Sequence, residues 1–283
     1  MNNFHITREL PYAGVFGLIE NGVIAKLAVS NFTVNIQAAD AAAIYIGSVA
    51  GKIYTKGTSI LAEITECTAD GLIRASGDSI YAGGIVGEAV VSDDTMRLNI
   101  QNCYSLTAME INAKSLSMAG GIAGRFSGAT LGISGVDRCY FAGTISAKSP
   151  LSAYAGGIVG FLFDTEAYIE TELSATATLS EIAETGTVRN CFATGELTAE
   201  ANEFSCYAGQ IYAYKNKEAT MKNCVGYKEM KITASKIQYA DRTEELSETF
   251  HTAAFLKTIG FDTETVWQVN EAALPTLRYE ATA

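Results

Sequence analysis

The segment Tyr-Ala-Gly-Gly-Ile-Val-Gly at residues 81–87 recurs along this chain at a nearly constant interval. It returns as Met-Ala-Gly-Gly-Ile-Ala-Gly at 118–124 and as Tyr-Ala-Gly-Gly-Ile-Val-Gly at 154–160, and degenerate copies end at Gly17, Gly51 and Ala213. The six end positions (17, 51, 87, 124, 160 and 213) are separated by 34, 36, 37, 36 and 53 residues. A period in this range predicts a solenoid, a propeller or another repeat array.

Five of the six cysteines follow the same period. Their intervals are 36, 36, 52 and 33 residues, so each occupies the same place in successive repeats: Cys67, Cys103, Cys139, Cys191 and Cys224. Metal sites instead use clustered cysteines with histidine nearby. Because a buried cysteine behaves as a small hydrophobe, we expect a column of reduced, inward-facing thiols that serves packing. Cys206 lies outside the series, and we expect it to have a different environment.

Apolar residues repeat in register with these cysteines. They precede each cysteine by three positions, at Ile64, Ile100, Val136, Val188 and Met221, with Ile24 before Leu27 in the first unit. They also follow by six positions, at Ile73, Met109, Ile145, Leu197 and Met230, and by eight, at Ala75, Ile111, Ala147, Ala199 and Ile232. Two positions before the end of each glycine motif stands a β-branched residue: Val15, Val49, Ile85, Ile122, Ile158 or Ile211. Such side chains favour strands.

An asparagine directly before the cysteine in several repeats indicates a corner. Asn102, Asn190 and Asn223 hold this position. The step of three between the two inward positions breaks the alternation of a strand, so the backbone must bend there. Asparagine tolerates the left-handed conformation that such a bend requires.

These patterns predict an all-β fold, a right-handed parallel β-helix of about six coils with a C-terminal cap containing short helical turns. Helical repeats would show apolar residues at a spacing of 3.6 over ten or more positions, and the units do not. A β-propeller or another β-solenoid is the alternative. Stacked ladders of identical positions favour the β-helix.

The ends and the long interval suggest the domain boundaries. Residues 1–240 are expected to form the β-helix, with an acidic insertion at about 161–187 that leaves the rod as an arm. Residues 241–283 hold the densest large aromatic residues, and we expect them to form a cap that plugs the last coil, since solenoids need covered ends. The first 11 residues are too few to cover the opposite end well, which suggests a missing upstream segment.

Composition excludes some classes of partner. The 283 residues carry a net charge of −11, which argues against nucleic acid, whose phosphates attract basic surfaces. No apolar stretch reaches the roughly 18 residues of a membrane span, so direct membrane insertion is not expected. The chain begins without the basic and apolar regions of a signal peptide.

The repeat resembles the GLUG family, whose name comes from a Gly-Leu-any-Gly pattern. The matching residues are Gly-Ile-Val-Gly at 84–87 and 157–160 and Gly-Ile-Ala-Gly at 121–124, each followed in the repeat by an apolar-any-Asn-Cys or related segment. The Phe-Asp and Val-Trp elements near 261–267 look like the closing element of such arrays. This resemblance implies a bacterial cell-surface or secreted protein, often adhesin-like, with an extracellular location. A host-cell glycan or surface protein would be the partner.

No catalytic, cofactor-binding or metal-binding residue stands out, and we expect a non-catalytic module that presents a binding surface. The alternatives are a carbohydrate-active β-helix enzyme, such as a polysaccharide lyase or hydrolase, and an accessory domain of a larger secreted protease. An enzyme would need carboxylates that face one groove. The candidates are Asp93 with Asp94, and Asp137 beside Arg138. Only two histidines, His5 and His251, are available for nucleophilic catalysis. If the module binds, we expect the insertion at 161–187 to lie near the site.

Overall fold

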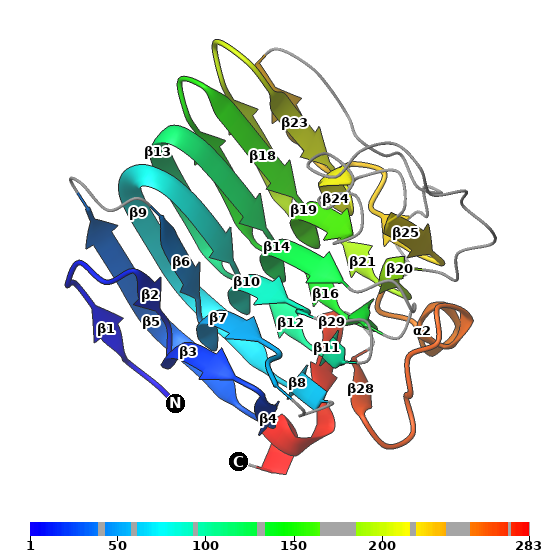
Figure 1. The fold of residues 1–283 in the computed structure, drawn as a ribbon. Coiled ribbons are helices and arrows are strands. Elements are labelled where there is room, and N and C mark those ends of the chain that lie inside the picture. The colour runs from blue at the N-terminus through cyan, green and yellow to red at the C-terminus, as the bar shows by residue number, and fades with distance from the viewer. Residues whose placement is uncertain are drawn as a thin grey trace, which may run out of the picture.

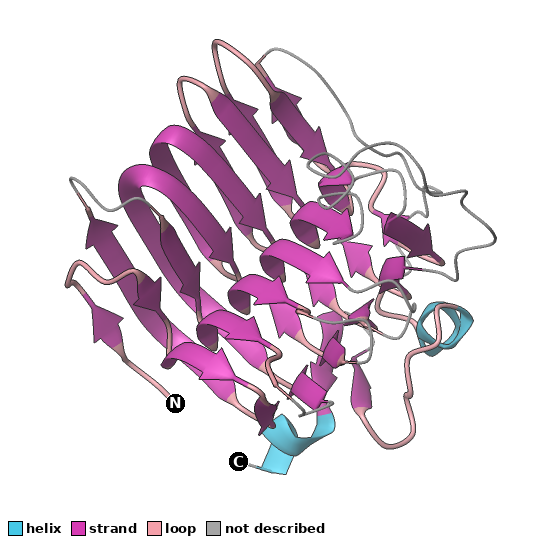
Figure 2. Ribbon diagram, viewed as in Figure 1, coloured by secondary structure: helices cyan, strands magenta, loops and turns pink. Residues whose placement is uncertain are grey.

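The chain forms a parallel β-solenoid in which each coil stacks on the next (Figure 1). The computed structural model describes residues 1–38, 43–57, 61–92, 96–128, 134–164, 185–215, 219–235, 250–270 and 273–282. Strands dominate these residues, and helix occurs only near the C-terminus (Figure 2). Within the three large sheets every strand pair that the structure describes is parallel and joins successive coils, which confirms the β-helix rather than the propeller.

Two of the three sheets contain one strand from each coil. The first has the order β24-β19-β14-β10-β7-β3. Its strands are β3 (Phe16–Glu20), β7 (Ala50–Tyr54), β10 (Val86–Val90), β14 (Ala123–Gly128), β19 (Val159–Asp164) and β24 (Tyr212–Lys215). The second has the order β25-β20-β15-β11-β8-β4. Its strands are β4 (Gly22–Ala25), β8 (Leu61–Thr65), β11 (Arg97–Gln101), β15 (Gly135–Asp137), β20 (Thr185–Arg189) and β25 (Ala219–Lys222).

The third and largest sheet bends back on itself at the upper left of Figure 1, so that its long strands run out to a bend and return. The outgoing strands are β1 (His5–Ile6), β5 (Ala28–Gln37), β9 (Thr68–Gly83), β12 (Tyr104–Ser105), β13 (Ala108–Gly120), β16 (Tyr140–Phe141), β17 (Thr144–Lys148), β21 (Phe192–Ala193), β22 (Glu196–Glu200), β26 (Val225–Gly226) and β27 (Ile232–Ala234). Both β9 and β13 also continue into the returning layer, whose other strands are β2 (Tyr12–Ala13), β6 (Ile44–Gly47), β18 (Ser152–Gly156) and β23 (Cys206–Gly209).

The apolar ladders stack as the repeat predicts. Ile100 pairs in register with Ile64 on one side and Val136 on the other, and Ile122 N–H donates to the Ile158 carbonyl of the next coil. These side chains are fully buried in one continuous core. The cysteine column is confirmed as inward-facing: all six thiols are free and buried, Cys206 included, which lies in the core from strand β23.

The corner before each cysteine has the predicted left-handed backbone. Asn102, Asn190 and Asn223 have φ of 50°, 54° and 52°. Lys26, Glu66 and Arg138 take the same conformation at the same place in their coils, so the requirement of the corner overrides the usual preference for asparagine or glycine. The glycine motif forms a second corner. There a Cβ on Gly83 would collide with the Val86 carbonyl oxygen, so close backbone approach explains this glycine.

The last coil departs from the predicted spacing. Leu197 pairs with Ile232, and Ala199 pairs with Ala234, whereas the repeat predicted Met230 and Ile232 at these two positions. The physical reason is an extra turn, in which Met230 N–H donates to the Tyr227 carbonyl at 3.1 Å. Two additional residues between the corner and the strand restore the inward register, because a shift by two keeps each side chain on its own face.

The C-terminal segment packs along the side of the rod, and the prediction that it plugs the last coil is wrong for residues 250–282. It comprises α2 (Ala253–Thr258), β28 (Trp267–Asn270), β29 (Ala273–Leu277) and the 3₁₀ helix η1 (Arg278–Thr282). Trp267 contacts Tyr104 and Tyr140, which belong to two successive coils. The segment thus runs back toward the N-terminal half (Figure 1). The boundary predicted near residue 240 falls outside the described residues.

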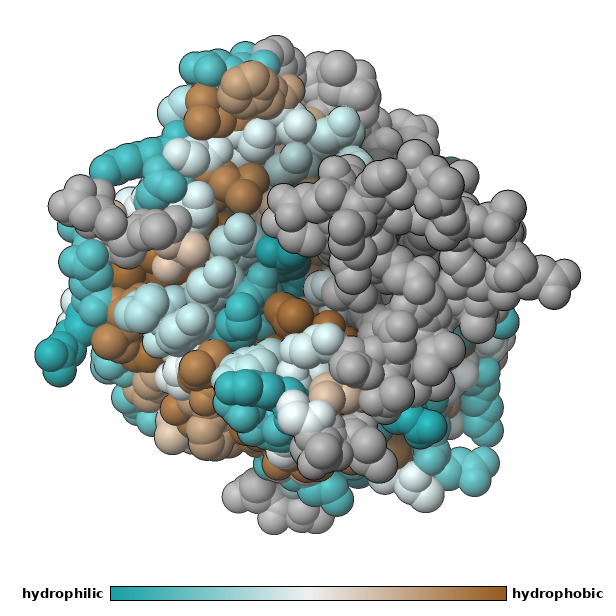
Figure 3. Space-filling model, in the orientation of Figure 1, coloured by the Kyte–Doolittle hydropathy of each residue, from teal (hydrophilic) through white to brown (hydrophobic). Residues whose placement is uncertain are grey.

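The N-terminal coil is less covered, as the sequence suggested. Among the residues that the structure describes, its strand β3 pairs with β7 alone, and its strand β4 pairs with β8 alone. Phe16, Leu18 and Val23 on these strands are all exposed. Apolar side chains accordingly gather at the surface over the first coils in Figure 3.

Candidate functional site

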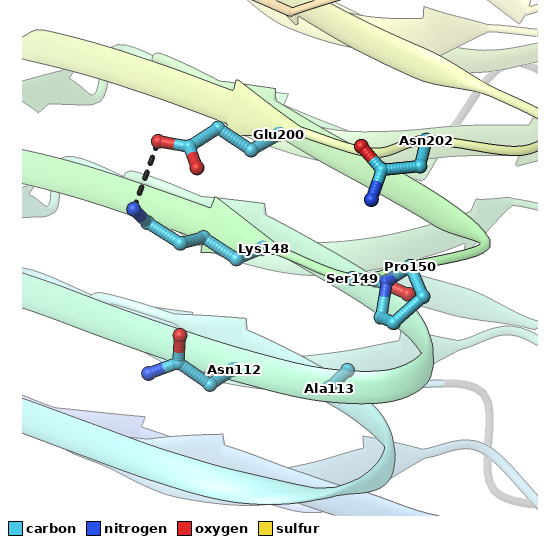
Figure 4. A pocket seen from close by; sticks show the side chains of 7 residues that line it. All are labelled: Asn112, Ala113, Lys148, Ser149, Pro150, Glu200 and Asn202. Atoms are coloured by element: carbon cyan, nitrogen blue, oxygen red, sulfur yellow. Dashed lines mark ion pairs between the residues drawn. The ribbon is translucent and has the colours of Figure 1, made fainter.

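A polar groove crosses the solenoid at the bend of the large sheet. It consists of two adjoining pockets of about 270 Å³ and 400 Å³, which share Asn112 and Ala113. The smaller pocket is also lined by Lys148, Ser149, Pro150, Glu200 and Asn202, and the larger by Gln37, Ala38, Ser76, Gly77 and Lys114. We call the whole the lateral groove. Figure 4 shows Asn112, Lys148 and Glu200 on successive strands of this groove.

The wall of the groove is a column of polar side chains, one from each of five successive coils. Its members are in register on five neighbouring strands: Gln37, Ser76, Asn112, Lys148 and Glu200. Gln37, Lys148 and Glu200 end their strands, and Ser76 and Asn112 are the equivalent positions inside the longer strands β9 and β13. Alternation along the strand directs each of these side chains away from the core. The five wall residues are of five different types, whereas the inward residue directly before each of them is apolar in every one of these coils.

The floor of the groove is made of small residues. Each follows a wall residue directly, and all are buried: Ala38, Gly77, Ala113 and Ser149. Ser149 also fixes the bend, because its Oγ donates to the Ser115 carbonyl at 2.8 Å and accepts from Leu151 N–H at 3.2 Å. Small floor residues leave the wall side chains standing over open space.

One ion pair dominates the electrostatics of the smaller pocket. Lys148 Nζ lies 2.8 Å from Glu200 Oε1, and both side chains are nearly half exposed (Figure 4). The two charges cancel, so this part of the groove is polar without a net charge. Partial exposure leaves the remaining donors of the ammonium and acceptors of the carboxylate open to a ligand.

An exposed aromatic residue lies on the segment that follows the smaller pocket along the chain. Phe204 is 71% exposed, more than any other large hydrophobic side chain in the described ranges. It follows the pocket residue Asn202 by two positions. Its N–H donates to the Leu151 carbonyl at 2.9 Å, directly after Pro150, which also lines the pocket. The backbone of this aromatic residue is therefore fixed to the rim of the groove.

A buried carboxylate lies elsewhere, on β10, one of the strands that follow the glycine corner. The Glu88 side chain is only 3% exposed, and it contacts Lys52 Nζ at 2.5 Å and Arg125 at 3.2 Å. Tyr45 packs face to face on Tyr81 and receives the Lys52 ammonium over its ring. Burial, with a smaller contribution from Glu88, raises the pKa of Tyr45 to about 12. Lys52 and Arg125 come from the coils on either side of the coil that holds Glu88. The cluster therefore links three successive coils by ion pairs.

Asp137, one of the candidate carboxylates predicted from the sequence, is likewise buried and held in ion pairs. Its side chain is 7% exposed, with Arg138 at 3.1 Å and Arg189 at 3.3 Å. Asn190 Nδ2 donates to it at 2.8 Å. The carboxylate thus ties two successive coils together, and it does not line the lateral groove.

The other predicted positions are not brought together with the groove. Asp93 and Asp94 lie outside the described residues, as do residues 165–184 of the insertion. His5 is on the first strand, and His251 precedes α2 in the C-terminal segment, so they belong to separate parts of the molecule. Sequence reasoning missed the groove, because its wall varies in residue type from coil to coil.

The described residues contain neither a candidate metal site nor a candidate membrane-spanning helix. That part of the chain contains no group of three or more His, Cys, Asp or Glu side chains arranged to hold a metal ion. It also contains no helix that is long and apolar enough to cross a membrane.

Comparison with known proteins gives a match in fold alone. No family model and no curated protein matches the chain. One solved crystal structure is similar, that of a Bacteroides ovatus protein assigned provisionally as an immunoglobulin A1 protease. The TM-score is 0.60 at 17% sequence identity, with 98% of this chain and 74% of that chain covered.

Proposed function

We propose that this chain is a non-catalytic binding module of a secreted or cell-surface bacterial protein, and that the lateral groove is its binding surface. The observation that carries the proposal is the in-register column from Gln37 to Glu200, which forms one continuous polar wall over five coils. The paired strands beneath it form a rigid scaffold, and rigid scaffolds commonly position binding residues at their bends and loops.

The candidate acids are held in ion pairs, which supports binding rather than catalysis. Asp137 and Glu88 are each held between two cations, and Glu200 is paired with Lys148. A catalytic acid and base in a glycosidase flank the scissile bond with their carboxyl groups directed to it. Among the described residues that line the groove, Glu200 is the one carboxylate, so no second carboxylate faces it there.

The resemblance to the GLUG repeat supports a bacterial surface or secreted protein, adhesin-like or a stalk. The fold shared with the Bacteroides protein is compatible with that place, and it keeps open a role as an accessory module to a protease. We propose an extracellular or surface location on these grounds. Labelling intact cells of the source bacterium with an antibody to the chain would test it, and signal only after lysis would contradict it.

The groove itself is tested by paired variants. Lys148→Ala removes a groove side chain, and Arg74→Ala is the matched control, since Arg74 is half exposed in a similar cross-coil pair with Glu110 on the same sheet. Binding of the purified chain to a panel of bacterial polysaccharides and host glycoproteins should fall for Lys148→Ala only. Equal binding by both variants, or release of new polysaccharide ends during the same assay, would contradict the proposal.

A further inference from the structure

We propose that the lateral groove binds an uncharged oligosaccharide of several sugar units, laid along the solenoid axis, with Phe204 as a stacking platform at one end. The inference rests on the proposed function, because it names the ligand class of that same groove. Four features of the groove support it: the type of polar groups, their charge, the exposed ring and the length.

The wall offers paired donors and acceptors. Carboxamides such as that of Asn112 present an acceptor oxygen beside two donor hydrogens, and the Glu200 carboxylate presents two acceptors. Adjacent hydroxyl groups of a sugar ring are separated so that both can bond to one such planar group. The Asn112 side chain is exposed in the shared part of the two pockets.

The charge of the lining favours a neutral ligand. Lys148 and Glu200 neutralise each other at 2.8 Å, which leaves Lys114 as the one further charged side chain among the described residues that line the two pockets. A site for a polyanion would show clustered Arg or Lys side chains. Gln37, Ser76 and Asn112, the remaining wall residues, are uncharged.

The ring of Phe204 is available for stacking. At 71% exposure, its apolar surface is in water, and covering it with the C–H face of a sugar would remove that surface from water. Its backbone hydrogen bond to Leu151 fixes its attachment to the rim without using the ring. An exposed ring on the segment after Asn202 adds an apolar surface to the amide and carboxylate groups of the wall, and this combination suits a ligand with both hydroxyl groups and apolar C–H faces.

The length and the floor exclude other ligands. Five strands at a spacing of about 4.8 Å give a wall of about 19 Å, longer than a single sugar. A peptide bound as an added strand would need an unpaired strand edge. The groove crosses β9, β13, β17 and β22, each of which is paired on both sides. Its small, buried floor residues provide no deep apolar pockets for peptide side chains.

Calorimetric titration of the purified chain tests the proposal. The probes are linear neutral glucan, xylan and mannan oligosaccharides of two, four and six units, acidic galacturonic acid oligomers of the same lengths, and an extended-peptide library. Neutral oligosaccharides should bind, and affinity should rise from two to four units and then level off. Phe204→Ala and Asn112→Ala should each weaken binding by about tenfold, as truncation of a central contact commonly does.

The control is Phe16→Ala, which removes an exposed phenylalanine on the first coil, far from the groove; it should leave affinity unchanged. Circular dichroism would establish that all variants remain folded. If only acidic oligomers or peptides bind, and Asn112→Ala weakens them, the groove is a binding site but this inference is wrong. If no probe of any class binds, or if groove variants change the affinity of no probe, both this inference and the proposed function are overturned.

Discussion

The indole Nε1 of Trp267 donates a hydrogen bond to Oδ1 of Asn102 at 3.4 Å, across 165 positions of sequence. Asn102 is the left-handed corner of a central coil, and its Oδ1 also accepts from Arg138 at 3.2 Å. The C-terminal segment is therefore fastened to the corner of the repeat itself, on the side of the rod.

Removing the indole should release this attachment. Trp267 is fully buried, and truncation of a buried Trp costs about 3–5 kcal/mol, so Trp267→Ala should lower the free energy of unfolding by that amount. Trp267→Phe keeps a ring but loses the hydrogen bond, and should cost less. Urea denaturation gives both values. A loss below about 0.5 kcal/mol for Trp267→Ala, typical of a surface site, would refute the lateral packing.

The β-branched ladder should be the most sensitive part of the core. Ile122 is fully buried in the middle of the stack, so Ile122→Ala should cost about 2–5 kcal/mol. Arg97→Ala, on an exposed position of β11, serves as the control and should change stability by less than about 0.5 kcal/mol. Thermal and chemical denaturation would measure both. Similar losses at the two positions would show that the assigned register is wrong.

The thiol column should be almost inert in the folded protein. Burial raises the pKa of Cys103, Cys139 and Cys191 well above the ordinary value, and the thiolate is the reactive form. A hydrogen bond with Cys103 lowers the pKa of Cys67, so Cys67 should react before these three as the protein begins to open. Timed alkylation with mass spectrometry would give the order. Prompt labelling of Cys139 in the native protein would contradict a closed core.

The C-terminal attachment should depend on pH through Glu280. Burial raises the pKa of this carboxyl above its ordinary value of 4.5, although Tyr104 donates a hydrogen bond to it at 2.8 Å, which acts in the opposite direction. A raised pKa in the folded state means that the carboxyl contributes stability when protonated, below its unfolded pKa. That stability is lost as pH rises through the folded value.

Glu280→Gln mimics the protonated group, so it should raise the melting temperature relative to the parent chain at pH 7. The difference should shrink as pH falls through the raised folded pKa and should be lost below about 4, where the parent carboxyl is protonated in both the folded and the unfolded state. Melting curves of both proteins from pH 3.5 to pH 8 test this. A constant difference over that range would show that Glu280 does not titrate as proposed.

The interior of this fold could be read from the sequence, because stacking places equivalent residues in contact in every coil. The Ile100 and Ile122 columns, the cysteine column and the Asn102 corner are all where the repeat predicts them. The register of the last coil could not be predicted from the repeat spacing. The turn at Tyr227 adds two residues that the earlier coils do not have.

The lateral course of the C-terminal segment depends on contacts between distant residues, which a local pattern does not contain. One signal was present, however. The residue after each cysteine in three successive repeats is aromatic, at Tyr104, Tyr140 and Phe192, and alternation places it on the outer face. An outward aromatic ladder needs a cover, and Trp267 and Phe261 pack on it.

The groove escaped sequence analysis for a different reason. Core positions must fit their neighbours above and below, so they repeat, whereas Gln37, Asn112 and Glu200 face solvent and are free to differ. Only the register of the strands shows that they form one wall.

A crystal structure of the chain with a neutral hexasaccharide tests the central claim most directly. The account predicts sugar density along the wall over Asn112, Lys148 and Glu200, with one ring stacked on Phe204. Density at any other surface, such as the open first coil or the C-terminal segment, with an empty groove would contradict it.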